Sequence, residues 1–174
     1  MTSRRPLCTL ALALGALALA ASRAGAQGPT PSGETVGGIS CDAQEGQRIH
    51  IHQHLVIVDH GKPLDIPARI GIPAGKRCLY WLHTHTPDGM LHIEAPLDRT
   101  FTLGDFFTVW GQPLSSTSAA AAHVGKHEKV KVWLNGKAYT KDPRSIPLLA
   151  HADIVIQVGP PFKKPAAFTA WNGL

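Results

Sequence analysis

Apolar and polar residues alternate along most of the chain after residue 40, which is the pattern of β-strands. The longest such stretch covers residues 48–58. Its aliphatic positions would face a core, and its histidines would share the opposite face. The aliphatic positions are Ile49, Ile51, Leu55 and Ile57, and the opposite positions are His50, His52, His54, Val56 and Val58.

Further strands are expected at 78–85, 90–95, 130–134, 137–139 and 154–158. Asn135-Gly136 between two of them is a strong two-residue hairpin signal. One helix is expected where Leu103, Phe106, Phe107 and Trp110 fall on one helical face, with Thr102 and Asp105 as a capping pair. Residues 115–122 fit a loop or a frayed helix. The pattern predicts a mainly β fold, a small antiparallel sandwich or barrel with one short helix, and leaves cupin-like and jelly-roll-like forms open.

The N-terminus has the three parts of an export signal. Arg4 and Arg5 precede an apolar run at 7–21 that is too short to remain in a membrane, and Ala24-Gly25-Ala26 fits a cleavage site. We expect residues 1–26 to be a signal peptide, 27–40 a flexible lead-in and 41–174 one β-rich domain. The mature protein would be periplasmic or secreted, by the secretory or the twin-arginine route.

Charge gives no reason to expect nucleic acid or an anionic membrane as a partner. Once the leader is removed, fourteen Lys and Arg stand against twelve Asp and Glu, a net charge of +2. We expect no stable membrane anchor after cleavage. An exposed strand edge could still pair with a second copy to form a homodimer.

The mature chain keeps two cysteines, Cys41 and Cys78, because Cys8 belongs to the leader. In an oxidising compartment they most simply form one disulfide. Neither sulfur could then bind a metal.

Seven of the ten histidines fall in two short stretches, 50–60 and 83–92. Residues two apart on a strand share a face, so their imidazoles can converge on one ion. Thr86-Pro87-Asp88-Gly89 fits a type I turn, which would set His83 opposite His92 and His85 opposite Met90. The resulting candidate ligands for a metal are His83, His85, His92, His52, His54 and Glu94, with His50 as a further candidate.

Imidazole suits copper, zinc, nickel and iron. Without a thiolate or several methionines, the ligand set and the compartment favour one copper(II) ion, with zinc or iron as alternatives. Solvated histidines that respond to pH are the non-metal interpretation. His123 and His127 have the spacing of a helical metal pair, but Gly125 between them argues against it. His60 and His151 are expected to be structural or exposed.

Three functions fit these features. The first is an exported metal-binding protein with a role in copper handling or tolerance. The second is a mononuclear metalloenzyme with an open coordination position, in which Glu94 would be the catalytic acid or base. The third is a non-metal envelope module that binds a partner through Trp81, Phe106, Phe107 and Trp110, although their helical spacing favours core packing.

The segments HIHQHL, IPARIGIP, CLYWLHTHTPDGMLHIEAP and FTLGDFFTVWGQPL, over residues 48–114, resemble a group of secreted bacterial His-rich proteins. This resemblance supports the boundaries of the motif and implies no activity. A weaker likeness is to cupins, which hold a metal through a His-x-His pair, a Glu and a later His. His83 and His85 match the pair, but Glu94 follows His92, and the glycine pattern of cupins is absent.

Overall fold

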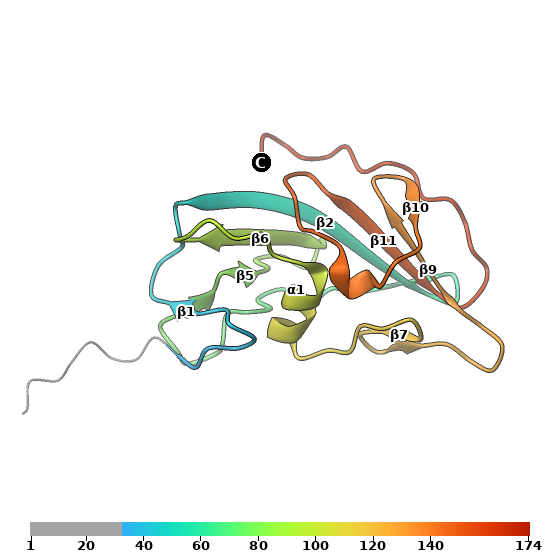
Figure 1. Ribbon diagram of the computed structural model, residues 1–174, viewed down its shortest axis with the longest axis horizontal. Coiled ribbons are helices and arrows are strands. Elements are labelled where there is room, and N and C mark those ends of the chain that lie inside the picture. The colour runs from blue at the N-terminus through green and yellow to red at the C-terminus, as the bar shows by residue number, and fades with distance from the viewer. Residues whose placement is uncertain (1–32) are drawn as a thin grey trace, which may run out of the picture. The chain divides into compact units, whose positions relative to one another are not determined.

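The computed structural model describes residues 33–174 (Figure 1). The expected signal peptide lies outside the described residues, as does the first part of the lead-in. The remainder of that lead-in packs on the domain, because Ile39 is fully buried and exchanges two backbone hydrogen bonds with Val36. No helix within 33–174 has the length and apolar character needed to cross a bilayer.

A seven-stranded mixed sheet forms the main layer, in the order β10-β9-β11-β2-β6-β5, with the short β3 beside β2. All neighbours are antiparallel except β11 and β2, which run parallel. The strands are β2 (Ile49–Asp59), β3 (Lys62–Leu64), β5 (Leu82–His83), β6 (Met90–Ala95), β9 (Val130–Leu134), β10 (Lys137–Tyr139) and β11 (Asp153–Val158).

Smaller elements form a second layer against one face of this sheet (Figure 1). They are helix α1 (Leu103–Trp110), the 3-10 turn η1 (Pro143–Ser145), the hairpin of β7 (Ser118–Ala119) with β8 (Ala122–His123), and the pair of β1 (Cys41–Asp42) with β4 (Leu79–Tyr80). The prediction of a mainly β fold with one short helix is confirmed. The described residues form an open sheet, so the barrel alternative is not found.

The core lies between the two layers. Phe106 and Phe107 of α1 are fully buried, and Trp81 is 9% exposed. Phe106 and Phe107 therefore pack in the core, as their helical spacing favours, and Trp110 packs against the same core while remaining partly exposed. The capping box of Thr102 and Asp105 is confirmed at the start of α1.

Two predicted elements differ from the structure. The strand expected at 78–85 is split at Trp81 into β4, which pairs with β1, and β5, which pairs with β6. Residues 115–122 form most of the β7–β8 hairpin and not a helix. The other expected strands lie within a residue of their predicted limits.

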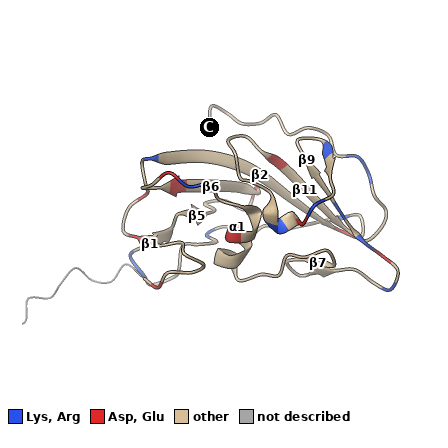
Figure 2. Cartoon of the chain, viewed as in Figure 1, with Lys and Arg blue, Asp and Glu red and all other residues tan. Residues whose placement is uncertain are grey.

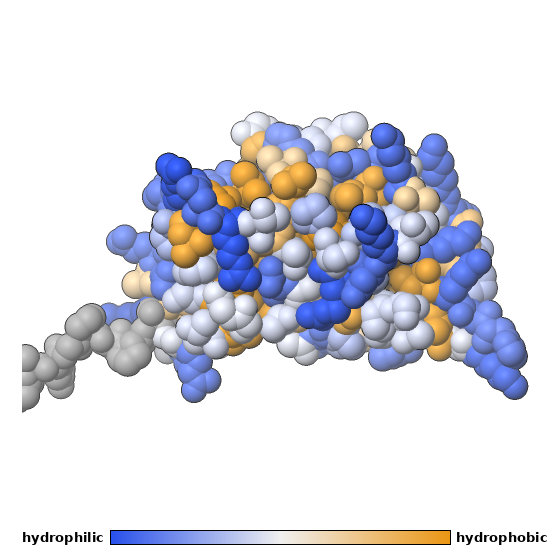
Figure 3. Space-filling model, viewed as in Figure 1, coloured by the Kyte–Doolittle hydropathy of each residue, from blue (hydrophilic) through white to orange (hydrophobic). Residues whose placement is uncertain are grey.

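The expected disulfide joins Cys41 and Cys78, with Cα atoms 5.3 Å apart. It lies at the β1–β4 pair and not on a strand of the main sheet. Lys and Arg are spread over several loops and strand ends (Figure 2). The face shown in Figure 3 likewise has polar side chains with small apolar areas between them.

Candidate metal centre

Three neighbouring strands bring four histidines and one glutamate onto the same face of the sheet. The middle strand, β6, carries His92 and Glu94. On one side His92 pairs with His83 of β5, and on the other side with His52 of β2. His50 is the Cα partner of Glu94. The alternating pattern of the sequence therefore predicted the shared face and the His83–His92 register correctly.

The expected four-residue turn is wrong, although the register that it predicted is right. β5 ends at His83, so His85 and Met90 do not pair. Thr84 leaves the hairpin because its backbone bonds to Arg69 and Ile70 of a preceding loop. His85 consequently lies at the start of a loop, with 44% of its side chain exposed.

His83 is oriented so that one ring nitrogen is free to bind a metal. Its Nδ1 lies 2.9 Å from the carbonyl oxygen of Tyr80. A carbonyl only accepts, so Nδ1 carries the proton and Nε2 presents a lone pair. That Nε2 lies 3.2 Å from Nε2 of His85. Ligands 2.0–2.1 Å from a tetrahedral ion are about 3.3 Å apart, so the spacing of this pair suits a shared ion.

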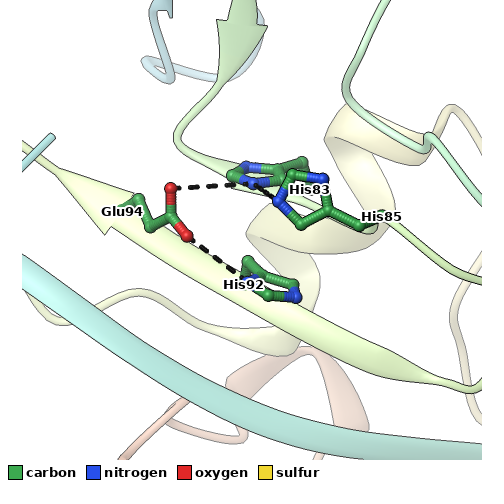
Figure 4. Close-up of side chains that lie close together, drawn as sticks. All are labelled: His83, His85, His92 and Glu94. Atoms are coloured by element: carbon green, nitrogen blue, oxygen red, sulfur yellow. Dashed lines mark hydrogen bonds and ion pairs between the residues drawn. The ribbon is translucent and has the colours of Figure 1, made fainter. Parts of the chain in front are cut away.

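Glu94 faces these histidines from β6 (Figure 4). Its Oε1 lies 3.3 Å from Nδ1 of His92, and its Oε2 lies 3.8 Å from Nε2 of His83. The residue is only 2% exposed. Within the part of the chain that the structure describes, Oε2 has no hydrogen-bond partner. A buried carboxylate oxygen without a donor is costly, and a cation would satisfy it.

Burial keeps the central imidazoles neutral. Burial, with a smaller contribution from neighbouring histidines, lowers the pKa of His83 to about 4 and the pKa of His92 to about 3. Burial also lowers the pKa of His52. Since only a neutral imidazole binds a metal, these rings are in the correct protonation state at neutral pH.

Glu94 titrates near neutrality because burial, and then the nearby Glu45, raise its pKa to about 7. Sequence reasoning missed Glu45, whose Oε1 lies 3.9 Å from Nε2 of His85. The next residue, Gly46, donates its backbone N–H to the carbonyl of Glu94. A Cβ at Gly46 would lie 2.2 Å from the backbone of Ala95, so only glycine allows this close approach.

Two groups within 33–174 have ligand atoms close enough to hold an ion, all within 4.8 Å of one another in each group. The first, which we call the inner group, consists of His83, His85, His92 and Glu94. The second, the outer group, consists of His50, His52 and Glu94. Glu94 belongs to both.

His54 lies outside both groups, although the sequence suggested it as a ligand. Its Nδ1 lies 3.1 Å from Asp153, and its ring stacks on Phe168 at 3.7 Å. His60 is half exposed between Asp59 and Glu128, and His151 bonds to a main-chain oxygen of Leu174.

His123 and His127 are exposed and lie on β8 and in a turn, so they do not form a helical pair.

Comparisons with known proteins give no relative: no family model, curated protein or solved structure matches the chain. The geometry of the histidine cluster therefore carries the functional assignment.

Proposed function

We propose that this chain is an exported protein that binds a transition metal through His83, His85, His92 and Glu94, and that it handles copper outside the cytoplasm. The observation that carries the proposal is the buried, unpartnered Oε2 of Glu94, which faces imidazole nitrogens held neutral by burial. Three nitrogens and one carboxylate oxygen match the ligand preference of a borderline divalent ion.

Copper(II) is the preferred ion because the ligands are mainly imidazole and both cysteines are consumed in the disulfide. Zinc and iron are the alternatives. The exposure of His85 supports a handling role, because an ion at the inner group could be taken up from solvent or passed on without unfolding. Export rests on the leader-like N-terminus and is supported by the disulfide, which is typical of oxidising compartments.

Titration of the purified, metal-free protein with copper(II) and zinc tests the proposal. We expect tight binding that the His83→Ala, His85→Ala variant weakens by at least about 100-fold, since two ligands are lost. A matched control replaces the exposed His123 by Ala and His127 by Asn, because His127 has a positive φ of 65° that Asn tolerates. Equal affinity of the ligand variant and the wild type would overturn the assignment. Elemental analysis of protein isolated without a nickel column identifies the native metal.

A metalloenzyme is the second candidate, and the solvent-facing position of His85 favours it. An ion at the inner group could keep a position for water or substrate beside His85, with Glu94 as the acid or base. An exchangeable water detected on the bound ion would favour this enzyme, and a closed shell of protein ligands would favour metal handling.

A further inference from the structure

We infer that the cluster holds two metal ions bridged by the carboxylate of Glu94, with the second ion on His50 and His52. The inference rests on the proposed metal binding and goes beyond it, because a single ion at the inner group would leave the outer histidines without a role. It is carried by the position of Glu94 in both candidate groups.

The two oxygens of Glu94 are directed toward different histidines. Oε1 lies 3.4 Å from Nε2 of His50, and Oε2 lies 3.8 Å from Nε2 of His83. Oε1 therefore lies against His50 of the outer group and also against His92, whose Nδ1 is 3.3 Å away, whereas Oε2 lies against His83 of the inner group. A carboxylate that binds one ion through each oxygen is a common bridge in two-metal sites, where the ions are about 3.5–4 Å apart.

Strand register supports the same arrangement. Successive residues on one face of a strand lie roughly 6.5–7 Å apart, so His50 and His52 can converge on one ion. His83 and His85 converge at the end of β5, where their Nε2 atoms are 3.2 Å apart. His50 and His52 lie on β2, and His83 lies on β5 with His85 in the loop that follows it; β2 and β5 are on opposite sides of β6, the strand that carries Glu94. His92, between them, contacts both pairs, with ring centroids 4.6 Å from His52 and 4.5 Å from His85.

Charge is compatible with two divalent ions. The five imidazoles add no positive charge when they are neutral, and Glu94 supplies a negative charge between the ions. Glu45 brings a second carboxylate to the exposed end of the inner group. The side chain of His50 is 47% exposed, so the outer ion would lie nearer to solvent and would exchange more readily than the inner one.

Copper(II) titration followed by electron paramagnetic resonance tests the bridge. The wild type should bind two equivalents; the first should give a full-intensity signal, and the second should reduce it, because two bridged copper(II) ions couple magnetically. The His50→Ala, His52→Ala variant should bind one equivalent with a full-intensity signal. The His123→Ala, His127→Asn variant should behave as wild type.

Each other outcome is decisive. One equivalent in the wild type, lost in the His83→Ala, His85→Ala variant, would overturn the second ion and leave the proposed function standing. Two uncoupled equivalents, or a second equivalent that persists without His50 and His52, would overturn the bridge. If no copper or zinc binds at all, the proposed function itself fails.

Discussion

The imidazoles of His83 and His92 are stacked across β5 and β6, with ring planes 12° apart and centroids 5.4 Å apart. Their Cα atoms are direct partners in the sheet. His83 is fully buried and the side chain of His92 is 14% exposed. Burial removes the water that would solvate a positive charge on either ring, and two charges in this position would also repel each other, so protonation of the pair opposes folding.

The metal-free protein should therefore lose stability as the pH falls from about 6.5 to about 4. The native pKa values, about 4 for His83 and about 3 for His92, lie below the unfolded value of about 6.5, so the unfolded state binds more protons in this range. Glu94, with its raised pKa, acts in the opposite direction, but one carboxyl opposes two histidines. Urea unfolding after chelation should show the decline. A double His83→Asn, His92→Asn variant should flatten it, and an equally steep decline in that variant would exclude the pair as the cause.

Glu94→Gln should change stability and metal affinity in opposite directions. The native pKa of Glu94 is about 7, above its unfolded value of 4.5, so at pH 8 the buried carboxylate destabilises the metal-free fold. The neutral amide of Gln should therefore raise the free energy of unfolding at pH 8. It should change it little at pH 5, where Glu94 is already protonated in the native state. Metal affinity should fall by at least about tenfold. Denaturation at both pH values and competition with a chelator measure the two effects. A metal-free variant less stable than the wild type at pH 8 would contradict this.

The centre of the site could be predicted from the sequence because strand periodicity fixes which side chains share a face. Two alternating segments predicted that His83, His92 and Glu94 share a face. The register that buries Leu82, Leu91 and Ile93 on the other face is the one that the structure has. The same alternation placed His52 and His50 on β2.

Long-range neighbours could not be predicted in this way. β11 pairs with β2 in parallel from His54 onward, which brings Asp153 to that histidine. Nothing in the alternation of residues 48–58 indicates this partner. Glu45 lies in a loop, and its place beside Glu94 depends on the close approach at Gly46, which the local pattern does not encode.

His54→Gln should leave copper stoichiometry and affinity unchanged within about twofold, because His54 pairs with Asp153 and stacks on Phe168 instead of joining either group. We expect the free energy of unfolding to fall by about 1–2 kcal/mol as the hydrogen bond and the stacking contact are lost. His52→Gln, two residues earlier on the same strand, is the matched comparison and should lose an ion. If the His54 variant binds one ion fewer than the wild type, His54 is a metal ligand and this prediction is wrong.

Gln53→Met should stabilise the protein. Gln53 is fully buried on the core face of β2, and within residues 33–174 neither of its amide atoms has a hydrogen-bond partner. Methionine has a similar shape without that polar cost, so the free energy of unfolding should rise by about 1–2 kcal/mol. Gln157→Met is the control, because the amide of Gln157 bonds twice to the backbone of Lys163 and its loss should destabilise. Thermal melts of both variants measure the contrast, and a stabilised Gln157 variant would refute the reasoning.

Removing the disulfide should destabilise the fold, and bound metal should offset part of the loss. Cys41 and Cys78 are 37 residues apart, for which chain entropy gives about 4 kcal/mol. The bridge lies four residues before Glu45 and five before His83, so its loss loosens two segments that contribute to the inner group. Cys41→Ala, Cys78→Ala should lower the midpoint of urea unfolding, and copper in excess should raise it again by mass action. The control is a variant that lacks the disulfide and also lacks His83 and His85. If copper raises the midpoints of both variants equally, the recovery does not come from the inner group.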